Sequence, residues 1–333
     1  MFYRILTGDR FLTALIVFLF AFGIWIPAFI PPKIIASTDS INQMPFYLLI
    51  NKYLNGNFIL SGVIAFSIMM YEAFLMVRIN ARFVLVQQKT FLPALFFIII
   101  TGYSPYLLGW NAYLPSTLFV ILTLNIIFGS YNDQPNSYRI FEAGILLGLG
   151  SLFYAPLIYL LPFIWISGMV QRHFYWREIA FPFIGFFLPY LFVFAFLFFT
   201  NKNILEFLLV LKVQFVFSFS LPKINWIYLS FAIYLLLLVL MASVYLLKVF
   251  QFRKIYIRDY FMVLFWLFIS AVLIYCLLSG FNIGITYLLA IPVSYILTNY
   301  FINSKKSIGN KILLYILLGF SLFLAAQNLF NLI

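Results

Sequence analysis

The sequence is poor in charged residues, and above all in acidic ones. Its 333 residues include 20 Lys and Arg but only eight Asp and Glu, so that 8% are charged and 65% are hydrophobic. Soluble globular domains have about 25% charged and about 45–50% apolar residues. The composition therefore excludes a soluble domain and predicts an all-α, polytopic membrane protein with a single transmembrane domain over residues 1–333.

Cysteine and histidine each occur once. Cys276 can form no intrachain disulfide, and the chain has no Cys/His set for a metal ion. The net charge of +12 comes from bases scattered singly between apolar runs, which excludes a nucleic-acid partner. No Walker motif, dinucleotide fingerprint, HExxH sequence or nucleophile elbow is present. These absences leave no motif-based enzyme class.

Apolar runs near the bilayer-spanning length of about 20 residues are abundant. They predict eleven transmembrane helices, with a range of nine to twelve. The predicted spans are 11–30, 58–77, 91–101, 114–129, 141–153, 156–170, 179–199, 226–247, 260–279, 284–303 and 311–330. The span at 91–101 is short, and Tyr154-Ala155-Pro156 breaks a long apolar run, so either could be a re-entrant or kinked element.

The basic residues predict the orientation of these spans. With the N-terminus inside, 15 Lys and Arg fall in inner segments and five in outer ones. This bias predicts that the N-terminus lies on the inner side of the membrane and the C-terminus on the outer side. The first apolar segment is too long for a signal peptide and is expected to remain as the first span.

Two predicted outer connections are long, at 31–57 and 200–225. Each contains a segment in which apolar residues surround a few charges, "PFYLLINKYL" at 45–54 and "NILEFLLVLKVQF" at 203–215. Such segments are typical of helices that lie along the membrane surface. Elsewhere, Gly144 and Gly148 in "EAGILLGLGS" have the small-residue spacing that predicts close packing of membrane helices.

Few residues on the predicted outer side could carry chemistry. The two acids there are Asp39 and Glu206, one in each long connection, and the five bases are Lys33, Lys52, Lys202, Lys212 and Lys223. An acid that acts as a base or metal ligand, framed by lysines that hold a phosphate, suits transfer from a lipid-phosphate donor. The alternative for Asp39 is helix capping, because "STDS" is rich in N-cap and turn formers.

Two further candidates lie within or beside the spans. Glu72 is expected about one and a half helical turns inside the inner end of the second span. An acid within the membrane marks a functional site by default, but Glu72 could instead reach the interface or pair with Arg78 or Arg82. Asn111, in "GYSPYLLGWN", could line an outer cavity or belong to an aromatic belt.

The order of these features resembles that of the GT-C glycosyltransferases, membrane enzymes that use polyprenyl-phosphate-linked sugars. The resemblance implies a seven-span module over 1–200 with the outer loop 31–57, a second outer loop at 200–225, and four C-terminal spans over 226–333. It also implies that Asp39 is the catalytic base or the ligand of a divalent metal, and that the outer lysines hold the donor phosphate. The chain departs from the pattern because its first loop has one acid, no DxD or ExD pair follows, and the outer side has no arginine.

Residues 146–194 also resemble an uncharacterised family of flavobacterial inner-membrane proteins. This resemblance implies a bacterial inner-membrane location, and so a cytoplasmic N-terminus and a periplasmic C-terminus, but no particular activity. Two other functions stay open. One is a non-enzymatic scaffold or accessory subunit of an envelope or secretion complex, with protein partners in the membrane. The other is a transporter in which Glu72 is the coupling residue.

Overall fold

The computed structural model describes residues 11–30, 44–54, 57–132, 137–171, 176–201, 204–215, 225–277, 283–304 and 308–332. Over these ranges the chain forms helices and connections without a strand, which confirms the all-α prediction. In chain order the helices are α2 (Phe11–Trp25), η1 (Ile26–Phe29), α3 (Pro45–Leu54), α4 (Phe58–Phe83), α5 (Leu92–Gly102), α6 (Tyr113–Gly129), η3 (Ser130–Asn132), α7 (Ser137–Ser151), η4 (Ala155–Leu160), α8 (Leu161–Val170), α9 (Trp176–Phe199), α10 (Ile204–Gln214), α11 (Trp226–Val249), η5 (Phe250–Phe252), α12 (Ile255–Leu277), η6 (Ile283–Ile285), α13 (Thr286–Asn303) and α14 (Ile308–Leu332).

Seven helical segments of the described chain are long and apolar enough to cross a membrane. They are Phe11–Phe29, Phe58–Phe83, Glu178–Phe199, Trp226–Phe252, Ile255–Cys276, Ile283–Asn303 and Ile308–Phe330, and three shorter apolar helices accompany them. The chain is thus an all-α bundle of the kind found in multi-pass membrane proteins. A helix overlaps each of the eleven predicted spans, but the number of crossings and their orientation stay predictions.

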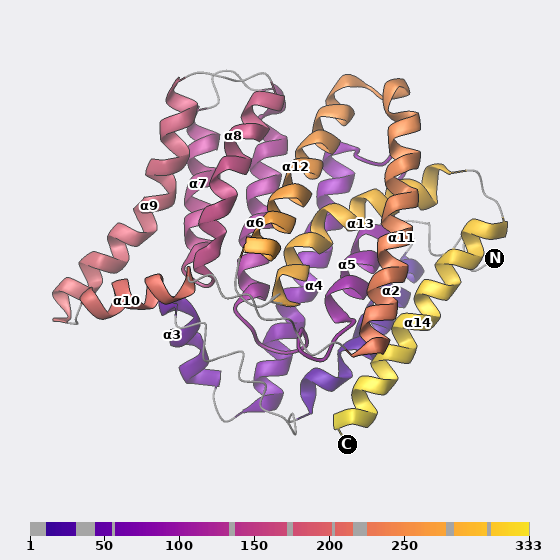
Figure 1. Ribbon diagram of the computed structural model, residues 1–333, viewed down its shortest axis with the longest axis horizontal. Coiled ribbons are helices and arrows are strands. Elements are labelled where there is room, and N and C mark those ends of the chain that lie inside the picture. The colour runs from indigo at the N-terminus through magenta and orange to yellow at the C-terminus, as the bar shows by residue number, and fades with distance from the viewer. Residues whose placement is uncertain are drawn as a thin grey trace.

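The centre of the bundle is formed by α5 and α13 (Figure 1). Every residue of α5 is buried, and so is nearly every residue of α13. The two helices pack against each other, and α13 also contacts α6, α11 and α12. A helix that is apolar on all sides is stable only when it is covered by protein or lipid, and here protein covers both. The hydroxyl of Tyr295 on α13 donates a hydrogen bond to the carbonyl oxygen of Met76 on α4, at 2.9 Å.

Helices α7 and α9 are in backbone contact. A Cβ atom at Gly144 would lie 2.5 Å from the carbonyl oxygen of Pro182, and one at Gly148 would collide with that of Phe186. From the other helix, a Cβ at Gly185 would collide with the carbonyl oxygen of Phe141. Close packing at Gly144 and Gly148 is therefore confirmed, and its partner is α9.

The predicted break at residues 154–156 is also confirmed. Helix α7 ends at Ser151, and residues 152–154 form a non-helical connection before η4, which we name the α7–α8 break. The amide groups of Phe153 and Tyr154 both donate to the carbonyl oxygen of Gly150, at 3.0 and 3.2 Å. The hydroxyl of Ser116 on α6 donates a third hydrogen bond to the same oxygen, at 3.2 Å. Protein groups thus satisfy the irregular backbone here, as a membrane interior requires.

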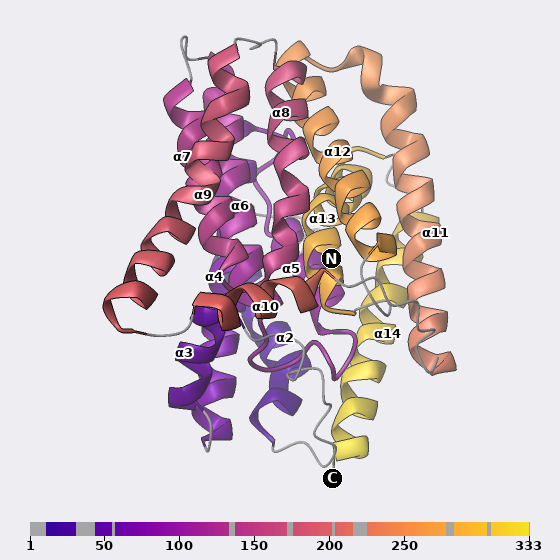
Figure 2. The ribbon, with the colours of Figure 1, turned by 60° about the vertical axis from the view of Figure 1, so that its left-hand side comes forward.

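The two surface segments expected at 45–54 and 203–215 are short helices, α3 and α10. They come from connections that lie far apart in the sequence, yet they lie side by side in both ribbon views (Figures 1 and 2). Their position along a membrane surface stays a prediction.

Candidate functional site

The residues that the sequence singled out fall into three groups. Lys33, Asp39, Lys202, Lys223 and the side chain of Glu206 lie outside the described residues. Lys52 on α3 and Lys212 on α10 are exposed. Glu72 lies within the bundle, and Asn111 lies in the connection between α5 and α6.

Helix α3 is anchored on two elements of the bundle. The ring of Tyr47 stacks on that of Trp110, with 6.2 Å between centroids and 3° between planes. Phe46 makes an edge-to-face contact with Phe153 at 5.6 Å, and its amide donates to the carbonyl oxygen of Leu152 at 3.4 Å. Trp110 belongs to the connection between α5 and α6, whereas Leu152 and Phe153 belong to the α7–α8 break.

Helix α10 reaches the same region from the other long connection. It packs against α9 and η4, and Phe215, directly after its end, makes an edge-to-face contact with Tyr159 of η4 at 5.8 Å. The two connections therefore converge on the α7–α8 break and the η4 turn that follows it. This convergence brings the helices that carry Lys52 and Lys212 to the same region.

The connection between α5 and α6 is organised by Asn111. Its side-chain oxygen accepts a hydrogen bond from the amide of Leu114 at 3.0 Å, and its side-chain nitrogen donates to the carbonyl oxygen of Leu107 at 3.0 Å. The hydroxyl of Tyr287 donates to the same carbonyl at 2.8 Å. Gly109 has a φ of +95°, which favours glycine. Asn111 thus holds the turn that begins α6, and its role in binding stays a prediction.

Several buried polar atoms around this connection have no hydrogen-bond partner in the described part of the chain. They are Trp25 Nε1, Ser104 Oγ and Trp110 Nε1. Trp25 Nε1 lies 3.6 Å from a Cβ built on Gly102, at the end of α5. Buried polar groups in proteins nearly always have a partner, so these three atoms are exceptions within the described residues. Sequence reasoning missed Trp25 and Ser104, because nothing local distinguishes Trp25 from the apolar run around it.

Glu72 on α4 is fully buried. Neither carboxylate oxygen has a hydrogen-bond partner within the described ranges. The carboxyl group faces the backbone of Leu118 on α6 and the hydroxyl of Tyr287 on α13, but it makes no hydrogen bond of good geometry with either. A carboxyl group without a partner in an apolar interior is costly, which is why such groups mark functional sites.

The alternative in which Glu72 pairs with Arg78 or Arg82 is wrong. Helix α4 continues to Phe83, beyond the predicted end of the span at 77, so Glu72 lies about 16 Å before the end of the helix. Its depth in the membrane stays a prediction. Arg78 and Arg82 are exposed and make no ion pair with it.

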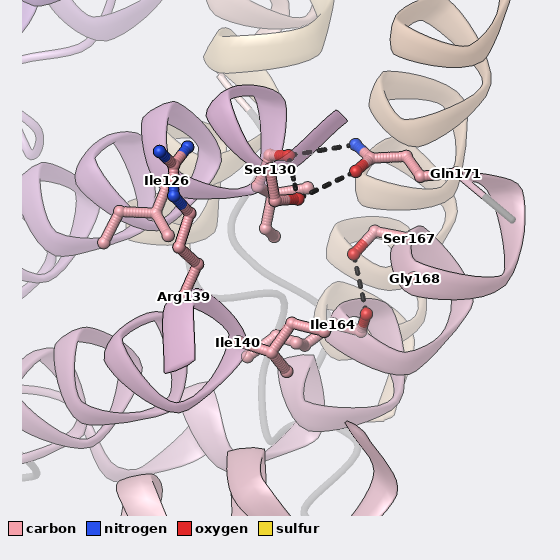
Figure 3. A pocket seen from close by; sticks show the side chains of 9 residues that line it. Ile126, Ser130, Arg139, Ile140, Ile164, Ser167, Gly168 and Gln171 are labelled. Atoms are coloured by element: carbon pink, nitrogen blue, oxygen red, sulfur yellow. Dashed lines mark hydrogen bonds between the residues drawn. The ribbon is translucent and has the colours of Figure 1, made fainter. Parts of the chain in front are cut away.

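A cavity lies at the C-terminal ends of α6 and α8 (Figure 3). It offers no site comparable to the buried carboxyl group of Glu72. Its volume is about 10 Å³, barely enough for one water molecule. Its polar groups are paired with one another: Gln171 Nε2 donates to the carbonyl oxygen of Ile127 at 3.0 Å, and its Oε1 accepts from Ser130 Oγ at 2.9 Å. Arg139 donates to the carbonyl oxygen of Gly129. These bonds close the end of α6.

The described residues contain no group of three or more His, Cys, Asp or Glu that could hold a metal ion. A divalent metal at Asp39 stays a prediction. No protein-family model matches the chain, and no curated protein or solved structure is significantly similar to it. Its function must therefore be argued from its own residues.

Proposed function

We propose that the chain is a GT-C-like membrane protein that moves a sugar from a polyprenyl-phosphate donor at the periplasmic face of the bacterial inner membrane. The observation that supports this proposal is that α3 contacts the α7–α8 break and α10 contacts η4, which follows the break directly. Each helix belongs to one of the two long connections, and each connection holds one of the two acids predicted outside. Segments far apart in the sequence meet in this way where a site is assembled.

In the proposed reaction, Asp39 acts as a general base. It takes the proton of an acceptor hydroxyl as that oxygen attacks the anomeric carbon of the sugar, and the bond from this carbon to the donor phosphate breaks. The leaving group is a polyprenyl phosphate, whose negative charge the lysines of the two connections would stabilise. Lys52 and Lys212 have the exposure that this role requires.

Replacing Lys52 and Lys212 by glutamine should weaken donor binding. Each exposed base near an anionic lipid surface contributes about fivefold in affinity, so the double variant should bind about 25-fold more weakly. The measurement is binding of a polyprenyl-phosphate sugar to the purified protein in nanodiscs. The control is Lys248→Gln, which removes an exposed base near the end of α11. Equal binding by the double variant and the wild type would contradict the phosphate-binding role.

A second candidate function is proton-coupled transport, and it is favoured by the buried carboxyl group of Glu72. The position lies between α4, α6 and α13, and so at the centre of the bundle. Transporters place ionisable groups at such positions to relay protons.

Replacing Glu72 by methionine should stabilise the protein and, if Glu72 couples transport, abolish that transport. Exchanging buried ionisable groups for well-packed apolar ones of similar volume often stabilises a protein by about 1–4 kcal/mol. The measurements are the thermal unfolding midpoint in detergent and proton-coupled uptake in proteoliposomes. Met69→Leu, a buried apolar exchange on the same helix, serves as the control. Proton-coupled uptake that survives in a second variant, Glu72→Gln, which keeps the shape of the side chain but cannot ionise, would remove the transport proposal.

A further inference from the structure

Helices α2 and α4 touch at one end only. Gly62 near the start of α4 lies so close to the end of α2 and η1 that a Cβ there would be 2.7 Å from the carbonyl oxygen of Ala28. The ring of Phe66 then packs edge-on against Phe18 and Trp25, at 6.0 and 6.2 Å. Beyond Phe66 both helices lie on α5 rather than on each other. A groove therefore begins beyond Phe66.

The groove has a volume of about 360 Å³, and every residue that lines it is apolar. Its walls include Ala14 and Leu15 of α2 and Ala73 and Phe74 of α4, and α5 forms the floor with Ala94. Leu15 and Phe74 are 46% and 57% exposed. Because α2 and α4 are both segments that can cross a membrane, this opening faces hydrocarbon.

Two exposed bases lie close in the sequence to residues that line the groove. Arg78 follows Phe74 by four residues, so it continues the face of α4 that lines the groove. Lys89 precedes Phe91, another lining residue, by two positions. Among the described residues of α2, α4, α5 and the connection between α4 and α5, the only acid is the buried Glu72, so the exposed charges that these segments bring to the groove are positive.

We propose that the groove binds one acyl chain of an anionic phospholipid, and that Arg78 and Lys89 hold the phosphate of its headgroup. A flexible hydrocarbon chain needs no polar partner, whereas an extended peptide segment would bring amide and carbonyl groups that this lining cannot satisfy. The two bases complement the charge of the headgroup. The site is separate from α3 and α10, and does not depend on the function proposed there.

The test is native mass spectrometry of the purified protein after exchange into phosphatidylglycerol or phosphatidylcholine with identical acyl chains. The wild type should retain phosphatidylglycerol in preference to phosphatidylcholine. Arg78→Gln with Lys89→Gln should reduce this preference by about fivefold for each base. Ala14→Phe, which fills the groove, should reduce retention of both lipids. Arg82→Gln is the matched control, because that exposed arginine on α4 lies over the ring of Phe83, 5.2 Å from its centroid.

An unchanged preference in the charge variant would overturn the role of Arg78 and Lys89. Unchanged retention of both lipids in folded Ala14→Phe would overturn the groove as the binding site. If Ala14→Phe fails to fold, the charge variant and its Arg82→Gln control still decide the proposal, because exposed polar side chains replace exposed bases in both.

Discussion

Replacing Gly148 by leucine is expected to force α7 away from α9 and to leave little folded protein. The added side chain would meet the carbonyl oxygen of Phe186, which belongs to a helical backbone and cannot rotate aside. Overpacking of flexible core side chains costs about 1–3 kcal/mol, and a contact between two backbones should cost at least the upper figure. The measurements are the yield of monodisperse protein in gel filtration and the thermal unfolding midpoint.

Gly319→Leu is the matched control for this variant. Gly319 lies in α14, and a Cβ there would have no neighbour within 4 Å. Its replacement adds the same side chain to an apolar helix without a clash, so yield and midpoint should stay near those of the wild type. If the two variants lose the same amount of stability, the backbone contact between α7 and α9 does not determine the packing of this region.

Replacing Asp39 by asparagine should abolish sugar transfer while the protein stays folded. Asparagine is nearly isosteric and caps helices about as well as aspartate, so the exchange removes a general base and preserves a cap. General-base catalysis contributes about 10²–10⁴-fold to a rate, and the transfer rate should fall by that factor. The measurement is transfer from a polyprenyl-phosphate sugar in proteoliposomes, together with the thermal midpoint.

Asp39 itself lies outside the described residues. Unchanged transfer in Asp39→Asn would remove the catalytic role. Unchanged growth of cells that carry the variant, with a stable partner complex recovered after mild detergent purification, would favour the scaffold function.

The helices of this fold could be predicted from the sequence because their signals are local. Apolar length located each of the seven long helices, Pro156 marked the break after α7, and apolar residues around Lys52 marked α3. The neighbours of each helix could not be predicted. Helices α11 and α13 are both apolar enough to cross a membrane, yet α13 is buried and α11 is largely exposed. Lipid and protein interior are equally apolar, so periodicity does not separate them.

The candidate site was predictable to a smaller extent. The sequence placed Lys52 and Lys212 on surface-type helices. The structure adds that α3 contacts the α7–α8 break and that α10 contacts η4, which follows it. The sequence could not exclude that Glu72 pairs with a base, because tertiary packing decides which groups a side chain on α4 meets. The unpartnered polar atoms of Trp25 and Ser104 could not be predicted from the sequence, because tertiary packing decides whether a buried polar atom finds a hydrogen-bond partner. Asn111 was recognised as notable, but its hydrogen bonds to Leu107 and Leu114 were not.

The burial of α5 has a consequence for how the protein is made. This helix has 11 residues and rises about 16 Å, roughly half the thickness of the hydrocarbon core. It therefore cannot cross the bilayer by itself as it leaves the ribosome. The helix that covers it, α13, begins only at Thr286. Helices α2 and α4, which also contact α5, precede it in the chain. The cover of α5 is therefore complete only when the last seventh of the chain is synthesised, so the C-terminal helices complete the first half of the protein.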